Sequence, residues 1–121
     1  MDYAELLPEL FQLKASRFYV ALACEPDRRR VLDIIRRESA VDQRIFVGVT
    51  NPIDPQVESA DEVCDRVLEA AEYIPAVRLG TTDDCGFSPF GDDRETARET
   101  AFEKIRARVE GTRLAAAKLG A

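Results

Sequence analysis

The sequence predicts an α/β fold in which three parallel strands, near residues 18–24, 44–50 and 77–82, alternate with helices. Two features of the sequence indicate this fold. Each predicted strand is a short run that is apolar on both faces, as in a parallel sheet covered by helices. The strands also begin about 30 residues apart, the length of a strand–helix–strand unit. With 121 residues, 45% of them hydrophobic, the chain can build one core, so residues 1–121 are taken as a single domain.

The first half of the chain predicts a helix, a strand and a second helix. The first helix extends from Asp2 to Leu13, because its leucines recur at helical spacing. The strand follows at Phe18–Ala23. The second helix begins at Pro26, a residue suited to a first helical turn, and ends at Glu38, with Arg28–Arg30 in solvent. The side chains expected to face the core are Leu6, Leu7, Leu10, Leu13, Val31, Ile34 and Ile35.

The second half predicts two further strands, each followed by a helix. Ile45–Val49 is the second strand. A capping box at Ser59–Glu62 starts a helix that Pro75 stops. The third strand, Val77–Thr82, precedes a polar loop and a last helix, Arg94–Leu119. The residues expected to be buried in the two helices are Val63, Val67, Ala70, Ala71 and Ile74, then Ala101, Ile105, Val109 and Ala116, with Gly120 as the C-terminal stop.

Composition and charge exclude several classes of function. The net charge of −6 disfavours a nucleic-acid surface, because phosphate binding depends on Lys and Arg. No apolar run is long enough to cross a bilayer, so no membrane contact is expected. Three cysteines, an odd and small number, fit the reducing cytoplasm better than a disulfide framework. Because the chain has no histidine, it cannot by itself form a Ser-His-Asp triad or a zinc site that needs imidazole.

Parallel α/β folds bind ligands at the C-terminal ends of their strands, and two of the three cysteines fall there. Cys24 follows the first strand and Cys85 the third, whereas Cys64 is expected to be a small buried helix residue. Three strands make about three-eighths of a (β/α)8 barrel, which needs about 250 residues. The sequence therefore predicts a terminal piece of such a barrel, and a small three-stranded open α/β domain is the alternative.

The segment around Cys85 resembles a known family. Asp83–Phe87, preceded by Glu72–Leu79, looks like the C-terminal end of the cobalamin-independent methionine synthases. Val47–Ser59 is similar to that family's penultimate strand and loop. The resemblance implies that the chain is the C-terminal three βα units of a (β/α)8 TIM barrel. It also implies a transferase in which zinc, with Cys85 as one ligand, activates a substrate thiol for attack on an alkyl donor.

The zinc ligands implied by this resemblance are incomplete in this chain. The family's His-x-Cys pair lies upstream, and Ala23 takes the position of the family's zinc glutamate unless a shifted register brings in Glu25. The epoxyalkane:coenzyme M transferases of the same superfamily lack that glutamate, and residues 18–28 and 80–90 look closer to this branch. There the zinc-bound thiolate of coenzyme M opens an epoxide. The alternative reaction is methyl transfer from methyltetrahydrofolate to homocysteine, the methyltransferase step of methionine biosynthesis.

By this resemblance, Cys85 is the predicted metal ligand. Asp84, Cys24 and Glu25 are expected to support the metal site or to face the substrate, and no cofactor-binding loop is recognised. The expected cofactor is zinc in the complete barrel, bound weakly or not at all by this chain alone. The expected partners are a small-molecule thiol and an alkyl donor, with either a second copy of the chain or the missing N-terminal part of the barrel. The alternative is a non-catalytic α/β module that self-associates or completes another chain's barrel.

Overall fold

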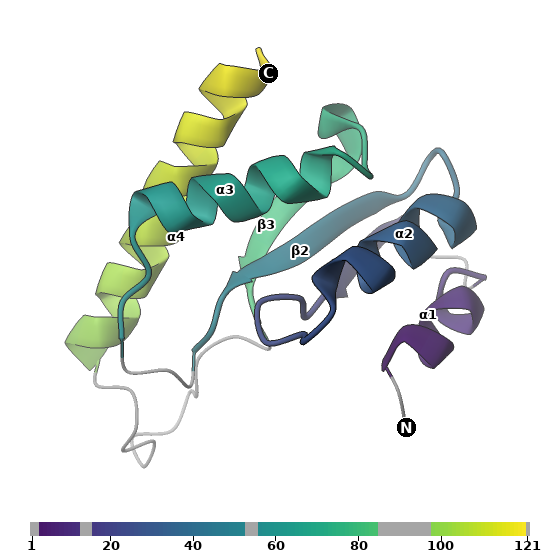
Figure 1. Cartoon of the computed structure of the whole chain (residues 1–121), viewed down its shortest axis with the longest axis horizontal. Helices are drawn as coiled ribbons and strands as arrows, with labels where there is room; N and C mark the ends of the chain where they lie inside the picture. The colour runs from purple at the N-terminus through teal and green to yellow at the C-terminus, as the bar shows by residue number, and fades with distance from the viewer. Residues whose placement is uncertain (1–2, 13–15, 53–55, 85–97, 121) are drawn as a thin grey trace.

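A three-stranded parallel sheet runs through the computed structural model, which describes residues 3–12, 16–52, 56–84 and 98–120. The elements in chain order are α1 (Tyr3–Leu10), β1 (Arg17–Val20), α2 (Arg28–Glu38), β2 (Arg44–Thr50), α3 (Ala60–Ala71), the short 3-10 helix η1 (Ala76–Arg78), β3 (Leu79–Asp83) and α4 (Arg98–Leu119). Both β1 and β3 pair with β2 in parallel, so β2 is the middle strand (Figure 1). The predicted alternation of parallel strands and helices is confirmed.

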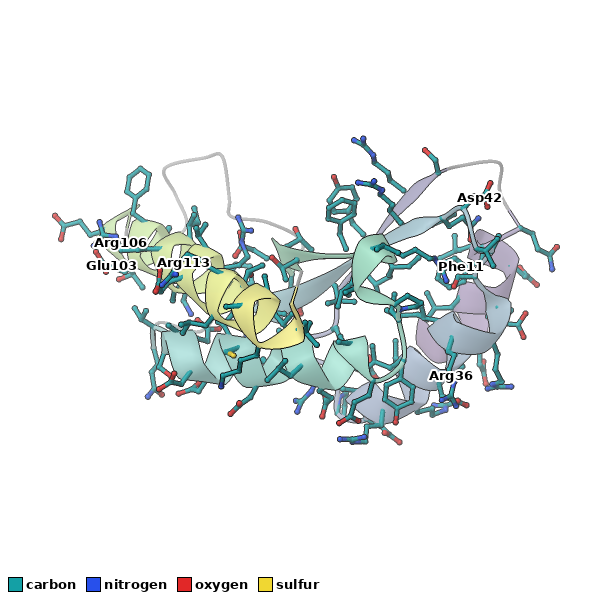
Figure 2. All side chains as sticks on the ribbon, turned by 90° about the horizontal axis from the view of Figure 1, so that it is seen from above. Phe11, Arg36, Asp42, Glu103, Arg106 and Arg113 are labelled. Atoms are coloured by element: carbon teal, nitrogen blue, oxygen red, sulfur yellow. The ribbon has the colours of Figure 1, made fainter. Side chains whose placement is uncertain are left out.

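One face of the sheet carries the hydrophobic core. Alternate residues of β2, namely Ile45, Val47 and Val49, are fully buried, as the two-residue period of a strand requires. They join a cluster that includes Val31 and Ile35 of α2 and buried aliphatic residues of α3. Figure 2 shows α3 and α4 together on this side of the sheet. None of the helices in the described ranges combines the length and the apolar character that crossing a bilayer requires.

The opposite face of the sheet carries an exposed aromatic pair. Tyr19 of β1 and Phe46 of β2 are in register, and their rings stack with centroids 4.9 Å apart. Tyr19 is 64% exposed. The ring of Phe46 extends over Gly80 of β3, where an added β-carbon would lie 2.4 Å from a ring atom. The sheet is therefore covered by α2, α3 and α4 on one face and leaves Tyr19 largely in solvent on the other.

Several predicted element boundaries are wrong by a few residues. β1 ends at Val20, and α2 begins after Asp27, whose side chain accepts a hydrogen bond from the N–H of Arg30, so Pro26 precedes the cap. The strand predicted from Val77 begins only at Leu79. Val77 is 83% exposed in η1, because the chain makes a 3-10 turn after Pro75. The side chain of Arg78 fixes this turn by donating hydrogen bonds to the carbonyl oxygens of Gln43 and Ala40.

The buried faces of two helices also differ from the prediction. Leu10 of α1 is 37% exposed, and the core position is taken by Phe11, which packs edge-on against Phe18. In α4 the predicted Val109 is 56% exposed. The buried positions of α4 are Lys104, Gly111 and Ala115. The buried face of α4 is thus offset by one residue from the predicted face. The prediction missed it because this face is built from a lysine and small residues, which an apolar pattern does not detect.

The predicted caps and the predicted burial of Cys64 are confirmed. The Ser59 hydroxyl accepts a hydrogen bond from the N–H of Glu62 at the start of α3. Cys64 is 1% exposed within α3. Gly120 follows α4 with φ of 72°, the left-handed conformation that favours glycine at a helix end.

The arginine run of α2 links two helices and does not simply face solvent as predicted. Arg28 Nε lies 2.9 Å from Glu69 Oε1 of α3, and Arg29 Nη1 lies 3.0 Å from Glu72 Oε2. Hydrogen bonds to the Tyr73 hydroxyl and to Glu72 raise the pKa of Arg29 above its ordinary value. These pairs are partly or fully exposed and contribute little energy, so they orient α2 on α3 more than they stabilise the contact.

The contact between α3 and α4 depends on Gly111. An added β-carbon there would lie 2.5 Å from Val63 and 2.6 Å from the carbonyl oxygen of Ala60. In Gly111→Ala the steric conflict outweighs the gain in helix propensity, so we expect a net loss of about 1–2 kcal/mol in unfolding free energy. Urea denaturation of this chain measures the difference. Equal or greater stability of Gly111→Ala would contradict this packing.

Candidate functional site

Asp84 organises the C-terminal edge of the sheet. It follows β3 and is 4% exposed. Its Oδ1 accepts hydrogen bonds from the backbone N–H groups of Leu22 at 3.0 Å and Ala23 at 3.1 Å. Its Oδ2 accepts one from the N–H of Cys24 at 3.0 Å. Because β2 separates β1 from β3, this carboxylate spans the middle strand and joins the segment after β1 to the end of β3.

Gly48 of β2 provides the space that this carboxylate occupies. An added β-carbon at Gly48 would lie 1.6 Å from Asp84 Oδ1 and 3.1 Å from the backbone nitrogen of Leu22. Such distances are far inside van der Waals contact, so no side chain fits at Gly48 while Asp84 keeps its position. The position of the Asp84 carboxylate therefore depends on the absence of a side chain at Gly48.

Asp83 ties the ends of β2 and β3 to α4. Its Oδ1 accepts a hydrogen bond from the hydroxyl of Thr50, and the N–H of Asp84 donates to the Thr50 carbonyl oxygen at 3.0 Å. The register shifts between Gly48 and Thr50, which brings Thr50 opposite Asp83. Arg108 Nε of α4 is 3.3 Å from Asp83 Oδ1, close enough for an ion pair although the two groups are not aligned as a hydrogen bond.

A buried ion pair holds the segment after β2 against α4. Lys104 is 0% exposed, and its Nζ lies 2.8 Å from Oε1 of the buried Glu58. The same ammonium donates to the carbonyl oxygen of Gln56 at 2.7 Å. Glu58 Oε2 accepts from the N–H of Asn51, the residue after β2, at 2.7 Å. The sequence pattern did not single out Lys104, and the one signal for it is its position one residue away from the predicted apolar face of the last helix.

The residues predicted for the site are only partly placed by the structure. Cys85 lies outside the described residues, directly after Asp84 in the sequence. Cys24 is exposed at the C-terminal edge, and its N–H binds Asp84. Glu25 is half-buried, and its N–H donates to the Leu22 carbonyl oxygen at 3.1 Å. The structure therefore brings the predicted Asp84 and Cys24 together. No group of three or more His, Cys, Asp or Glu residues among the described residues is arranged to hold a metal ion.

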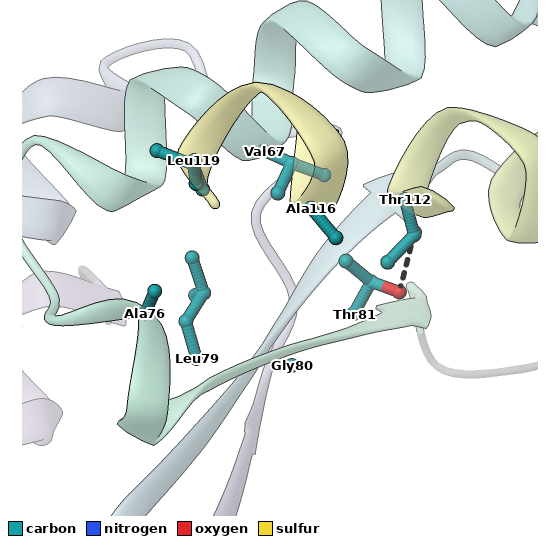
Figure 3. Close-up of a pocket in the computed structure, with 8 residues that line it drawn as sticks. All are labelled: Val67, Ala76, Leu79, Gly80, Thr81, Thr112, Ala116 and Leu119. Atoms are coloured by element: carbon teal, nitrogen blue, oxygen red, sulfur yellow. Dashed lines mark hydrogen bonds between the residues drawn. The ribbon is translucent and has the colours of Figure 1, made fainter. Parts of the chain in front are cut away.

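An apolar cavity of about 100 Å³ lies between β3, α3 and the end of α4 (Figure 3). Two hydroxyl groups, on Thr81 and Thr112, lie 3.0 Å apart; that of Thr112 donates to the Arg108 carbonyl oxygen at 2.6 Å, so it accepts the bond from Thr81. The described residues that line it include no charged side chain. Its lining residues are Val67, Ala76, Leu79, Gly80, Thr81, Thr112, Ala116 and Leu119.

The sequence is similar to two kinds of characterised protein. It is 38% identical over 74 residues to 2-hydroxypropyl-CoM lyase of Xanthobacter autotrophicus, a match that covers 61% of this chain and 18% of the lyase. It is 24% identical over 113 residues to methionine synthase of Saccharolobus solfataricus, covering 93% of this chain and 31% of that protein. The methionine synthase of Thermococcus kodakarensis is 29% identical over 110 residues, with 90% and 30% covered. The resemblance to the methionine synthase superfamily is confirmed.

The chain spans less than a third of the length of these relatives. No family model matches it. The match to 2-hydroxypropyl-CoM lyase confirms the predicted resemblance to the coenzyme M branch of the superfamily.

A solved structure confirms the predicted fold. The B12-independent methionine synthase from Shewanella sp. W3-18-1, solved in complex with selenomethionine, superposes on 97% of this chain and 31% of its own, with a TM-score of 0.76. The sequence identity is 21%, so this match establishes the fold alone. The three strand–helix units of this chain correspond to part of a TIM barrel. In such a barrel the helices form the outer ring, so the face with Tyr19 and Phe46 is the inner one.

Proposed function

We propose that this chain forms the last strand–helix units of a zinc-dependent thiol alkyltransferase. The observation that carries the proposal is the buried Asp84 at the end of β3, with Cys85 next in the sequence, in a chain whose relatives are named methionine synthase and 2-hydroxypropyl-CoM lyase. Enzymes with barrel folds place their catalytic residues at this end of their strands. Cys85 is the second residue after β3 in the sequence and is proposed to supply one thiolate to zinc.

The donor set in this chain fits a partial zinc site. Thiolate sulfur is a ligand that zinc favours, whereas the two oxygens of Asp84 are already engaged by three backbone N–H groups. Asp84 is therefore proposed to support the site, with Cys24 and Glu25 beside the substrate. The further ligands must come from the rest of the barrel, and we expect this chain alone to hold zinc weakly or not at all. When bound, zinc lowers the pKa of a substrate thiol so that a thiolate persists at neutral pH.

The proposed reaction is attack of a thiolate sulfur on a carbon of the alkyl donor. With coenzyme M and an epoxide, a sulfur–carbon bond forms as a carbon–oxygen bond of the ring breaks, and the resulting alkoxide takes a proton. The 38% identity to 2-hydroxypropyl-CoM lyase favours this reaction. The second candidate is methyl transfer from methyltetrahydrofolate to homocysteine, which the broader coverage by methionine synthases, 93% of this chain, favours.

The proposal is tested by completing the barrel. The chain would be co-expressed with the N-terminal part of a 2-hydroxypropyl-CoM lyase, and the purified complex would be assayed with coenzyme M and a short epoxide, and separately with homocysteine and methyltetrahydrofolate. Zinc-dependent formation of a thioether in one assay is the expected result. A folded complex that carries zinc and alkylates neither thiol would favour the non-catalytic module.

The open face of the sheet predicts that the isolated chain self-associates. The inner face exposes Tyr19, and β1 and β3 each pair on one side only within the described sheet. We expect a homodimer at micromolar concentration in light scattering, and a shift toward monomer in Tyr19→Lys. Val77→Lys, which changes an even more exposed apolar residue of η1, is the control and should leave the dimer intact. A stable wild-type monomer would contradict this prediction.

A further inference from the structure

We propose that Asp84 is a positioning residue that fixes the segment 22–25 relative to the end of β3. This segment contains Cys24 and Glu25, and the last residue of β3 lies two positions before Cys85. The catalytic consequence rests on the proposed function, whereas the clamp itself is a property of this chain's own contacts. We call the Asp84 carboxylate and its three backbone donors, Leu22, Ala23 and Cys24, the Asp84 clamp.

The first support is the number and kind of hydrogen bonds in the clamp. Three consecutive N–H groups converge on one carboxylate at 3.0, 3.1 and 3.0 Å. Pairing of β1 with β2 ends at Val20, so these N–H groups lie beyond the ladder. Successive backbone N–H groups that point the same way form a concave site for an anion, and a carboxylate can accept all three bonds. Because the site is buried, removing the acceptor leaves donors without a partner, which is costly.

The second support is independent and comes from Gly48. Its φ is not positive, since among the described glycines only Gly120 has that conformation. A glycine in the interior of a strand weakens the strand unless close approach of another group requires it. Here that group is Asp84, whose Oδ1 would lie 1.6 Å from an added β-carbon. The residues on either side of Gly48 in the chain, Val47 and Val49, carry large buried side chains, so β2 lacks a side chain only where the Asp84 carboxylate crosses it.

The clamp makes the position of residues 22–25 depend on β3. The segment after β1 has no ladder bonds of its own beyond Val20, and the three bonds to Asp84 replace them. Cys24 and Glu25 therefore keep a fixed place beside the residue that precedes Cys85. In the proposed reaction, small displacements of groups around the reacting atoms lower the rate strongly, since a shift of about 1 Å can lower it by about 10²-fold.

Asp84→Asn distinguishes the clamp bond to Cys24 from the bonds to Leu22 and Ala23. An asparagine placed like Asp84 keeps an oxygen toward Leu22 and Ala23 but turns an NH2 group, a donor, toward the N–H of Cys24. Hydrogen exchange measured by NMR on this chain should therefore show faster exchange at Cys24 than at Leu22 and Ala23. Asp84→Ala should expose all three amides, and added formate, a small carboxylate, should restore part of their protection. Asp65→Asn, on the exposed side of α3, is the matched control and should change none of them.

Two outcomes decide the proposal. In the completed barrel, Asp84→Asn is expected to lower kcat by at least about tenfold while the protein stays folded and its zinc content changes little. Unchanged exchange at residues 22–24 in Asp84→Asn would overturn the clamp, whether or not the barrel is active. Lost protection together with wild-type kcat and KM would overturn the positioning role.

If wild type itself fails to alkylate either thiol, the proposed function fails, and the exchange rates still decide the clamp. Where Asp84→Ala does not fold, Gly48→Ala, whose β-carbon displaces the carboxylate, should expose the same three amides.

Discussion

Replacing Lys104 with methionine is expected to lower the free energy of unfolding by about 3–5 kcal/mol. Lys104 is 0% exposed, and its ammonium binds both the carboxylate of Glu58 and the carbonyl oxygen of Gln56. Methionine keeps most of the side-chain volume but leaves the buried carboxylate with only the more distant guanidinium of Arg66, whose Nη1 lies 3.9 Å from Oε2. Urea denaturation measures the loss, or the thermal midpoint if the variant is too unstable for extrapolation.

Two further variants distinguish the effect of losing the ion pair from the general effect of removing a lysine. Lys118→Met changes an exposed residue in the last turn of α4 and should alter stability by less than about 0.5 kcal/mol. The double variant Glu58→Gln with Lys104→Met removes the buried charge as well, so it should recover part of the loss. A loss below about 1 kcal/mol in Lys104→Met would mean that this pair does not hold the segment after β2 to α4.

Cys85→Ser is expected to lower alkyl transfer by the completed barrel by more than about a hundredfold. Removing groups that only support a metal ligand lowers metal affinity or activity by about 10–100-fold, so losing a ligand itself should exceed that range. Serine keeps the size of cysteine but offers a hydroxyl that stays protonated and binds zinc poorly. The fold should survive, because the packed core of the described residues lies in the sheet and helices.

Cys64→Ser is the matched control for this prediction. Cys64 is 1% exposed in α3 and belongs to the hydrophobic core. Its replacement should lower stability through lost packing and leave turnover largely intact. A fall in turnover of the same size in both variants would assign the effect of Cys85→Ser to folding.

The sequence predicted those elements whose signals are local. The apolar run Ile45–Val49 and the cap at Ser59 are both found in the structure, because strand burial and capping depend on neighbouring residues. The face of α4 was predicted wrongly. Its apolar pattern favours Val109, but the side packed on α3 carries Lys104 and Gly111. Lys104 is buried there because it pairs with Glu58, and Gly111 because α3 and α4 pack closely. Hydrophobic periodicity detects neither cause.

The candidate site shows the same division between local and distant signals. The sequence placed Asp84 and Cys24 at the ends of two strands, because parallel strands end at a common edge. It did not predict that Asp84 would accept the N–H of Leu22, a residue 62 positions away, across Gly48. Glu58 and Lys104 are 46 positions apart and meet only when α4 packs on the sheet. Contacts of this kind depend on the register of β2 and β3, which the pattern of one sequence leaves open.

The most direct test of the proposed role of Cys85 is the zinc content of the completed barrel after dialysis, compared between wild type, Cys85→Ser and Cys64→Ser. If Cys85 is a zinc ligand, wild type and Cys64→Ser will retain one tightly held zinc per complex, and Cys85→Ser will lose it while remaining folded. Full zinc retention by Cys85→Ser, with normal alkyl transfer, would contradict the assignment of Cys85 and the proposed function with it.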